Sequence, residues 1–359
     1  MSSTNLIKAF VLVKPGHFEW QERPMPRPEP GQALIRTKKV GICGSDIHAY
    51  RGRQPSLVTP CILGHEILGE VVEINYLSPQ NSPVSIEPGD RVVVDPKIAC
   101  QNCYACSINR ENICENLKTL SVHVDGGLTE YFLAGLEQLY RVPEQVSDQE
   151  AVLAEPLSIG AQAIERGRVG RNEQVVILGA GPIGLTTLVL AKEKGARVAM
   201  LDLWPNRLAA AKNIGADLVI NVNAREEEEV LKQIKEFCSG HGPEVLIDAA
   251  AVQKTAKLAI KALARTGRLV VLGMAKPDVW LPYLPILKKE LDIIGSRMAT
   301  NHQFSVVLDF FQRSKWSKIL SEQLVTAQYP FRDVQSAIEF SEKHPEKAIK
   351  VIIDFESED

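Results

Sequence analysis

The chain has 359 residues, of which 45% are hydrophobic, and a formal net charge of −3 at pH 7. This length is sufficient for two domains with separate cores, and the weak charge argues against a nucleic-acid or anionic-lipid partner. No stretch approaches the roughly 18 consecutive apolar residues that span a bilayer, and residues 1–8 lack the apolar segment of a secretory signal. We therefore expect a cytoplasmic protein without a membrane or nucleic-acid partner.

The N-terminal third is predicted to be rich in β-strands. Strands are expected at Leu6–Val13, Gln32–Val40 and Ile67–Ile74, where β-branched and other apolar residues concentrate between Pro-Gly turns. The stretch Asn75–Ile86 contains two prolines and no periodicity, which predicts a loop. This pattern is typical of an antiparallel barrel or sandwich.

A regular alternation of strands and helices begins near Ala151, which predicts βαβ units and a parallel sheet. The last sixty residues are mixed and are expected to return to the first domain. The predicted domains are therefore 1–150 with 296–359, and 151–295. The expected strands are Val175–Leu178, Arg197–Leu201, Leu218–Asn221, Val245–Asp248, Arg268–Leu272, Leu291–Ile294 and Ala348–Asp354, and the expected helices are Ile183–Lys194, Pro205–Ile214, Glu226–Phe237, Lys254–Ala264, Gln303–Gln312 and Phe331–Lys343.

Four cysteines lie within fifteen residues, at positions Cys100, Cys103, Cys106 and Cys114. This spacing lets four thiolates converge on one tetrahedral Zn²⁺ in a closed, structural site. The alternative is a pair of disulfides, which the expected reducing compartment disfavours. Two other cysteines, Cys61 and Cys238, have no partners at ligand spacing and are predicted to be small core residues.

A glycine-rich turn follows the strand Val175–Leu178 and opens a helix, which is the context of a dinucleotide-binding fingerprint. Its glycines permit a tight turn, approach of the pyrophosphate to the backbone, and close packing of helix on strand. Asp202 ends the next strand, where a carboxylate binds the ribose hydroxyls and repels a 2′-phosphate, so NAD is favoured. Arg207 lies one turn further on and leaves NADP open. The residues expected at the turn are Gly179, Gly181, Pro182, Ile183 and Gly184.

Two further motifs, residues 41–48 (Gly-Ile-Cys-Gly-Ser-Asp-Ile-His) and 64–66 (Gly-His-Glu), complete a recognisable set. Together with the four cysteines and the glycine turn, they resemble the zinc-dependent medium-chain alcohol and polyol dehydrogenases. The resemblance covers nearly the whole chain and implies an α/β fold, with a GroES-like β-rich catalytic domain and a Rossmann nucleotide-binding domain. It departs from the family pattern at Asn75, where a glycine is usual.

The resemblance implies two zinc ions per chain, one catalytic and one structural. Cys43 and His65 match ligands of the catalytic zinc. One branch of the family has a second cysteine ligand at the position of Glu155, and Glu155 is the matching candidate ligand here, as in the polyol and threonine branches. Glu66 matches a residue that binds the metal directly in some states and supports it in others, and the sequence does not choose between Glu66 and Glu155 for the resting state.

The chemistry implied is alcohol oxidation, in which Zn²⁺ lowers the pKa of a substrate hydroxyl and a hydride passes to the nicotinamide. Ser45, two residues after Cys43, is predicted to accept the hydroxyl proton. His48 is predicted to pass that proton to solvent, because its ordinary pKa lies near neutrality. The alternative for His48 is a turn histidine without a catalytic role.

The substrate is predicted to be a small polyhydroxylated molecule. Arg297 and His123 are the candidate substrate residues. With the segments around them they most resemble dehydrogenases of sugar acids, which implies a substrate such as L-galactonate or L-gulonate, whose carboxylate a guanidinium could pair with. An interdomain salt bridge is the alternative role for Arg297. Neutral polyols of the sorbitol or butanediol type and L-threonine remain alternative substrates, and a non-catalytic cofactor-binding protein is the remote alternative. Members of the family form homodimers or homotetramers, and the sequence does not choose between them.

Overall fold

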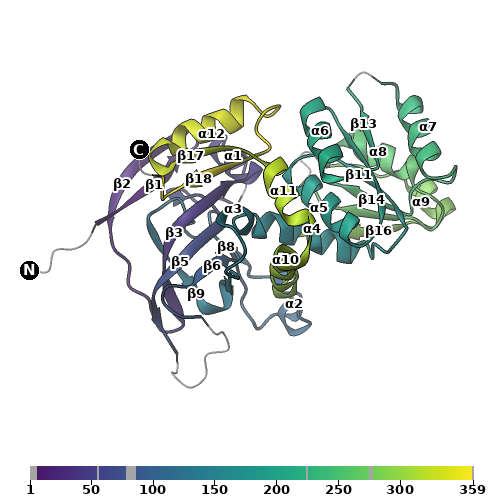
Figure 1. The fold of residues 1–359 in the computed structure, drawn as a ribbon. Helices are drawn as coiled ribbons and strands as arrows, with labels where there is room; N and C mark the ends of the chain where they lie inside the picture. The colour runs from purple at the N-terminus through teal and green to yellow at the C-terminus, as the bar shows by residue number, and fades with distance from the viewer. Residues whose placement is uncertain (1–5, 55, 78–85, 224, 275–277, 358–359) are drawn as a thin grey trace, which may run out of the picture. The chain divides into compact units, whose positions relative to one another are not determined.

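A computed structural model describes residues 6–54, 56–77, 86–223, 225–274 and 278–357. The chain forms two compact units (Figure 1). Unit 1 contains residues 1–155, 300–313 and 325–359, and unit 2 contains residues 156–299 and 314–324. Within the described residues, no helix is both long enough and apolar enough to cross a membrane.

Unit 1 is built on a seven-stranded sheet and a three-stranded sheet. The larger sheet has the order β10-β6-β5-β3-β18-β17 with β9 beside β3, the smaller has the order β2-β1-β4, and β7 pairs with β8. All of these pairs are antiparallel except β17 with β18. The strands are β1 (Leu6–Lys14), β2 (His17–Pro24), β3 (Gln32–Ile42), β4 (Cys61–Ile62), β5 (Glu66–Asn75), β6 (Arg91–Val94), β7 (Lys97–Ile98), β8 (Lys118–Thr119), β9 (Tyr131–Gly135), β10 (Leu139–Arg141), β17 (Val325–Pro330) and β18 (Lys350–Asp354).

Strand β3 contributes to two hydrophobic cores of unit 1. Its residue Ile35 packs in a cluster with β5 and β9, whereas Val40 packs in a second cluster with β1 and β18. The register against β5 shifts between Thr37 and Lys39. Because successive side chains of a strand alternate between faces, such an irregularity reverses which positions face a given core.

Short helices connect the strands of unit 1. They are α1 (Gly44–Tyr50), α2 (Tyr104–Ser107), η1 (Glu111–Ile113), η2 (Leu136–Gln138), α3 (Asp148–Ala151), α10 (Asn301–Arg313), η3 (Phe331–Asp333) and α12 (Val334–Lys343). The expected loop at Asn75–Ile86 begins where β5 ends, but its residues 78–85 lie outside the described part of the chain.

Unit 2 is a parallel six-stranded sheet with the order β13-β12-β11-β14-β15-β16. This is the strand order of a doubly wound dinucleotide-binding fold, so the predicted α/β class is confirmed. Helices α5, α6 and α11 lie on one face and α7, α8 and α9 on the other (Figure 1). The strands are β11 (Gln174–Leu178), β12 (Arg197–Asp202), β13 (Leu218–Asn221), β14 (Val245–Asp248), β15 (Arg268–Val271) and β16 (Asp292–Gly295), and the helices are α4 (Ala154–Arg166, beginning in unit 1), α5 (Pro182–Glu193), α6 (Pro205–Ile214), α7 (Glu227–Phe237), α8 (Gln253–Ala262), α9 (Tyr283–Lys289) and α11 (Trp316–Leu324).

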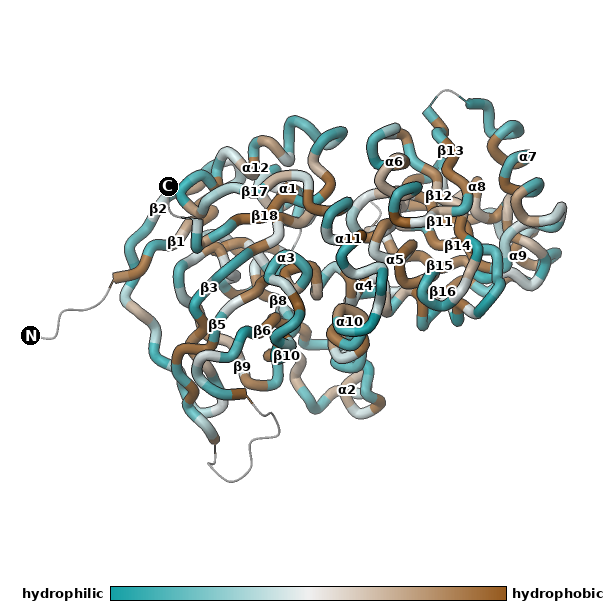
Figure 2. The backbone as a smooth tube through the Cα atoms, in the orientation of Figure 1, coloured by the Kyte–Doolittle hydropathy of each residue, from teal (hydrophilic) through white to brown (hydrophobic). Residues whose placement is uncertain are grey.

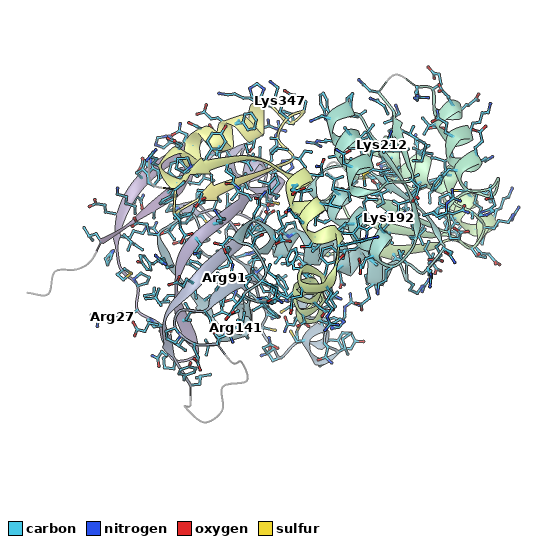
Figure 3. All side chains as sticks on the ribbon, in the orientation of Figure 1. Arg27, Arg91, Arg141, Lys192, Lys212 and Lys347 are labelled. Atoms are coloured by element: carbon cyan, nitrogen blue, oxygen red, sulfur yellow. The ribbon has the colours of Figure 1, made fainter. Side chains whose placement is uncertain are left out.

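The central strands of unit 2 are apolar on both faces, as expected for a sheet covered by helices on both sides. Figure 2 shows the hydrophobic colour along β11 and β14, whose residues are almost all buried. Polar contacts fix the helices to the sheet. Lys192 of α5, labelled in Figure 3, forms a 2.7 Å ion pair with Asp217, which also accepts a hydrogen bond from the Val198 amide of β12.

The last sixty residues are shared between the two units, whereas all of them were predicted to belong to the first domain. The segment 314–324, expected in the first domain, belongs to unit 2. The reason is α11, which packs on α5 and α6. Its Trp316 ring covers Gly215, and Gln323 accepts a 2.9 Å hydrogen bond from Asn213.

Candidate metal centre and nucleotide site

Three predicted ligands meet in unit 1. Ligand atoms of Cys43, His65 and Glu66 all lie within 4.8 Å of one another. Cys43 is the N-cap of α1, directly after β3, and His65 immediately precedes β5. Because β3 and β5 are paired neighbours, the two motifs meet although they are separated in sequence. A thiolate, an imidazole and a carboxylate are a donor set that suits Zn²⁺.

Asp46, in the first turn of α1, contacts the chain segments that carry Cys43 and His65. Its buried carboxylate accepts a 2.9 Å hydrogen bond from the Cys43 amide and a 3.4 Å bond from the Gly64 amide. It lies 3.6 Å from Nδ1 of His65. Burial alone raises the pKa of Asp46, but His65 and the two amides outweigh this effect and hold the pKa below its ordinary value. Asp46 is therefore an anion that fixes both ligand segments.

Glu155, in the first turn of α4, interacts electrostatically with His65 and Glu66, although it lies outside the set of three whose ligand atoms meet. Burial raises the pKa of its carboxyl to about 7, and the charge of Glu66 adds to the increase while His65 opposes it. The charges of His65 and Glu66 therefore both act on the Glu155 carboxyl, as expected for a residue at the edge of the candidate metal centre.

Lys350, which pairs with Glu66, was not among the predicted site residues. Lys350 on β18 is 1% exposed, and its Nζ donates to both carboxylate oxygens of Glu66 at 2.5 and 2.6 Å and to the Ile42 carbonyl at 3.1 Å. Burial lowers the pKa of Lys350, but Glu66 more than compensates and the pKa lies above its ordinary value. Gly41 on the intervening strand β3 permits this contact, because a Cβ there would lie 2.1 Å from Oε2 of Glu66. Lys350 is the first residue of β18, and nothing in the neighbouring residues marks it as a partner of Glu66.

The predicted proton-transfer residues lie on α1. Oγ of Ser45 is 3.5 Å from Nε2 of His65, and the exposed His48 lies one turn further along the helix. Residues three positions apart share a helix face. The structure thus brings Ser45 to the metal centre and His48 to the surface.

The two predicted substrate residues belong to different units. His123 is exposed, and its Nδ1 accepts a 3.1 Å hydrogen bond from the Thr119 amide within a turn of unit 1. Arg297 is an exposed residue of unit 2, between β16 and α10.

The four-cysteine lobe forms a second candidate metal site. The ligand atoms of Cys100, Cys103, Cys106 and Cys114 lie within 4.8 Å of one another. Sγ of Cys103 is 3.5 Å from that of Cys106 and 3.8 Å from that of Cys114. Four thiolates around a zinc ion are about 3.8 Å apart, given Zn–S bonds of about 2.3 Å, whereas a disulfide would bring two sulfurs to about 2 Å. The spacing therefore fits a closed metal site, and all four cysteines are free.

The predicted nucleotide turn lies between β11 and α5 of unit 2. Gly179 has φ +100°, and a Cβ at Gly184 would lie 1.8 Å from the Gly179 carbonyl oxygen, so both positions require glycine. Gly181 is the N-cap of α5, with Pro182 as the first residue of the helix. The amides of this helix start are available to bind an anion.

Asp202 lies at the end of β12, beside this turn. Its Oδ2 accepts a 2.6 Å hydrogen bond from the Ala180 amide, and its Oδ1 accepts a 2.8 Å bond from the Trp204 amide. Nη1 of Arg207 is 3.8 Å from the position that a Cβ of Gly181 would take. The acidic and the basic residue predicted for cofactor binding therefore both border the glycine turn.

Both halves of the chain match models of one family. Residues 29–144 match the alcohol dehydrogenase GroES-like domain, and residues 182–313 match the zinc-binding dehydrogenase domain. L-galactonate-5-dehydrogenase of Escherichia coli K12 is 32% identical over 99% of this chain and 100% of the relative. The chain belongs to the zinc-dependent medium-chain alcohol dehydrogenase family. It is accordingly an oxidoreductase that acts on CH–OH donors.

Other relatives are similar over most of their length. Human sorbitol dehydrogenase is 34% identical over 80% of each chain. The crystal structure of the alcohol dehydrogenase RspB of E. coli CFT073, in complex with NADH, is 34% identical with a TM-score of 0.87 over 98% of this chain and 99% of that one. A Sinorhizobium meliloti protein described as a zinc-binding dehydrogenase, bound to NADP, is 27% identical with a TM-score of 0.88 over 98% and 99%. These relatives include both NAD(H)- and NADP-bound members.

Proposed function

We propose that this enzyme oxidises a secondary hydroxyl of a sugar acid, such as L-galactonate or L-gulonate, to a ketone with NAD⁺ as the acceptor. The observation that carries the proposal is the carboxylate-rich metal centre, in which Cys43, His65 and Glu66 meet beside Glu155. Carboxylate in place of thiolate makes a metal site harder and more tolerant of water, which suits a polyhydroxylated substrate. Similarity to L-galactonate-5-dehydrogenase over the whole chain supports the choice of a sugar acid.

In this proposal Cys43, His65 and Glu155 hold the catalytic zinc, and Glu66 binds it in some states. When bound there, Zn²⁺ acts as a Lewis acid that lowers the pKa of a hydroxyl. The pairing of Glu66 with Lys350 favours Glu155 as the resting ligand, because both oxygens of Glu66 already accept hydrogen bonds. The four-cysteine lobe holds a second zinc that stabilises its fold.

Ser45 accepts the hydroxyl proton of the substrate, and His48 returns it to solvent. Ser45 is suited to this role because its Oγ lies 3.5 Å from the metal-binding face of His65. His48 is exposed on the same helix. An exposed imidazole exchanges protons readily near neutral pH.

The cofactor is held by the turn at Gly179, Gly181 and Gly184, and NAD is preferred over NADP. Asp202 accepts hydrogen bonds from two amides and so keeps its negative charge fixed beside the turn. That charge attracts ribose hydroxyls and repels a 2′-phosphate. Arg207 approaches the turn near Gly181, where it adds positive charge for the pyrophosphate. The bound nicotinamide supplies the hydride acceptor.

Arg297 and His123 are proposed to bind the substrate, with the guanidinium of Arg297 pairing with the substrate carboxylate. Neutral polyols are the second candidate substrates, favoured by 34% identity to human sorbitol dehydrogenase. None of the seven cysteines forms a disulfide, which suits the proposed location in the reducing cytoplasm.

Assembly as a homodimer or homotetramer is proposed from the surface of unit 2. Strand β16 pairs only with β15 among the described strands, and its Ile293 is 39% exposed. On α9 nearby in sequence, Tyr283 and Leu287 are also exposed. An uncovered strand edge beside exposed apolar side chains is a site at which chains associate.

The test is NAD⁺ reduction by purified protein with aldonates, the corresponding neutral polyols and L-threonine, compared as kcat/KM. Aldonates are expected to be turned over at least tenfold better than neutral polyols. Arg297→Met is expected to remove this preference, whereas Arg313→Met, an exposed arginine on α10, keeps it. A preference for neutral polyols would refute the sugar-acid proposal and support the second candidate. Turnover of none of the panel by protein loaded with zinc would favour a cofactor-binding role.

A further inference from the structure

The segment from Thr119 to Leu128 is held against the strand that leads to His65. The amides of Gly126 and Leu128 donate to the carbonyls of Ile62 and Leu63 at 2.7 and 3.0 Å. Asp125 accepts a hydrogen bond from the Ile62 amide at 2.9 Å. Any side chain that this segment directs inward therefore has a fixed position relative to His65.

Ser121 is that inward-directed residue. It is 3% exposed, and its Oγ lies 2.9 Å from Nδ1 of His65. Asp46 is the other candidate partner of Nδ1, but its nearest oxygen is 3.6 Å away, and its carboxylate already accepts from the Cys43 and Gly64 amides. The serine hydroxyl is thus the closest hydrogen-bond partner of this ring nitrogen.

The backbone at Ser121 is in the left-handed region, with φ +62°. L residues other than glycine, asparagine and aspartate enter this region at a cost, and glycine enters it freely. A serine at this position is therefore not explained by the turn itself. Its hydrogen bond to His65 supplies the reason for a side chain there.

We propose that Ser121 is a positioning residue for the metal-binding histidine. Its Oγ accepts the proton of His65 Nδ1 and so fixes the tautomer in which the lone pair of Nε2, on the side of Ser45, is free to bind a metal. Histidines that bind metals are oriented in this way by a partner of their second nitrogen.

This inference rests on the proposed role of His65 as a zinc ligand, and its test uses zinc affinity and not activity. The variants are Ser121→Ala, which keeps the backbone strain, and Ser121→Gly, which relieves it. Both remove the hydroxyl. Competition with a chelator is expected to show zinc affinity reduced about 10- to 100-fold at one of the two sites in both variants. The zinc in the four-cysteine lobe is expected to be retained with unchanged affinity.

Thermal unfolding of the zinc-free protein separates positioning from a purely structural role. Ser121→Gly is expected to melt at the wild-type temperature or above, because strain is relieved, and yet to bind zinc weakly. Asn172→Gly is the matched control, since Asn172 has φ +65° on the surface of unit 2 and its replacement leaves both zinc affinities unchanged.

Two results would overturn the inference. One is zinc affinity within twofold of wild type in both variants. The other is weakened affinity in Ser121→Ala but wild-type affinity in Ser121→Gly, because strain and not the hydroxyl would then be responsible. Failure of the proposed function is recognised separately: Cys43→Ala must remove one of two zinc ions, and a wild-type chain that binds only the four-cysteine zinc would refute the metal assignment and this inference with it.

Discussion

Replacing Lys350 by methionine tests the buried ion pair behind the metal centre. The change keeps the length and apolar stem of the side chain but removes the charge that faces Glu66. Both partners are almost fully buried, at 1% and 0% side-chain exposure, so solvent cannot replace the lost cation. Lys350 is also charged across the neutral range, because Glu66 holds the pKa of Lys350 above its ordinary 10.5 although burial lowers it.

The expected cost follows from the contacts that are lost. Nζ of Lys350 donates to both oxygens of Glu66 and to the Ile42 carbonyl. Removing one partner of a buried pair leaves an uncompensated charge and costs about 3–5 kcal/mol. We expect this loss in the zinc-free protein at pH 7. Bound zinc should reduce it, because a nearby cation again neutralises Glu66.

Urea unfolding, with hydrogen exchange of the β3 amides to isolate unit 1, measures the loss. Lys347→Met is the matched control, because Lys347 lies three residues earlier and is exposed (Figure 3). The double variant Lys350→Met with Glu66→Gln should recover much of the stability, since no buried charge remains. A loss in Lys350→Met of no more than about 0.5 kcal/mol, the range of ordinary surface changes, would refute the reasoning.

Three further predictions concern other parts of the chain. Cys103→Ser is expected to reduce bound zinc from two ions to one per chain and to lower the melting temperature. Cys61→Ala is the control, because Cys61 lies outside both clusters and its replacement should leave two zinc ions bound. Metal analysis of the purified variants measures the zinc content. Lys289 donates to three carbonyls at the end of α8 at 2.8–3.0 Å. Lys289→Met should therefore lower the unfolding free energy of unit 2 by about 1–3 kcal/mol, whereas Lys288→Met should not. Equal losses for the two variants in urea unfolding would contradict this prediction. Asp202→Asn should raise the KM for NAD⁺ and lower the ratio of kcat/KM with NAD⁺ to kcat/KM with NADP⁺. If this ratio did not change, the proposed role of the Asp202 carboxylate would be wrong.

The sequence predicted the fold class because periodicity and turn residues are local signals. Helix α4 was not predicted, since its sequence contains Pro156 and Gly160, which ordinarily interrupt helices. In the structure Pro156 lies in the first turn, where proline is tolerated. Gly160 lies where a Cβ would approach Oγ1 of Thr186 to 3.0 Å, so α4 and α5 pack closely there. Helix α4 thus forms because of its tertiary packing, which local helix propensity does not reveal.

The side chains that meet at the candidate metal centre were predicted only in part, for a similar reason. Cys43, His65 and Glu66 belong to short motifs that are visible in the sequence. Lys350 meets Glu66 across 284 residues of chain, and Ser121 meets His65 across 56. These two contacts depend on strand pairing and on one left-handed turn, and neither has a signature in the neighbouring residues.

Gly41 connects these arguments, because it is the residue of β3 that lies between Glu66 and the strand of Lys350. A Cβ at Gly41 would lie 2.1 Å from Oε2 of Glu66, so Gly41→Ala must displace the carboxylate from Lys350. We expect a loss of zinc-free stability approaching that of Lys350→Met, and no additional loss when the two changes are combined, because both disrupt one contact. Gly44→Ala is the control, since a Cβ there meets nothing within 4 Å. If Gly41→Ala proved as harmless as Gly44→Ala in urea unfolding, the Glu66–Lys350 geometry would not be what this glycine protects.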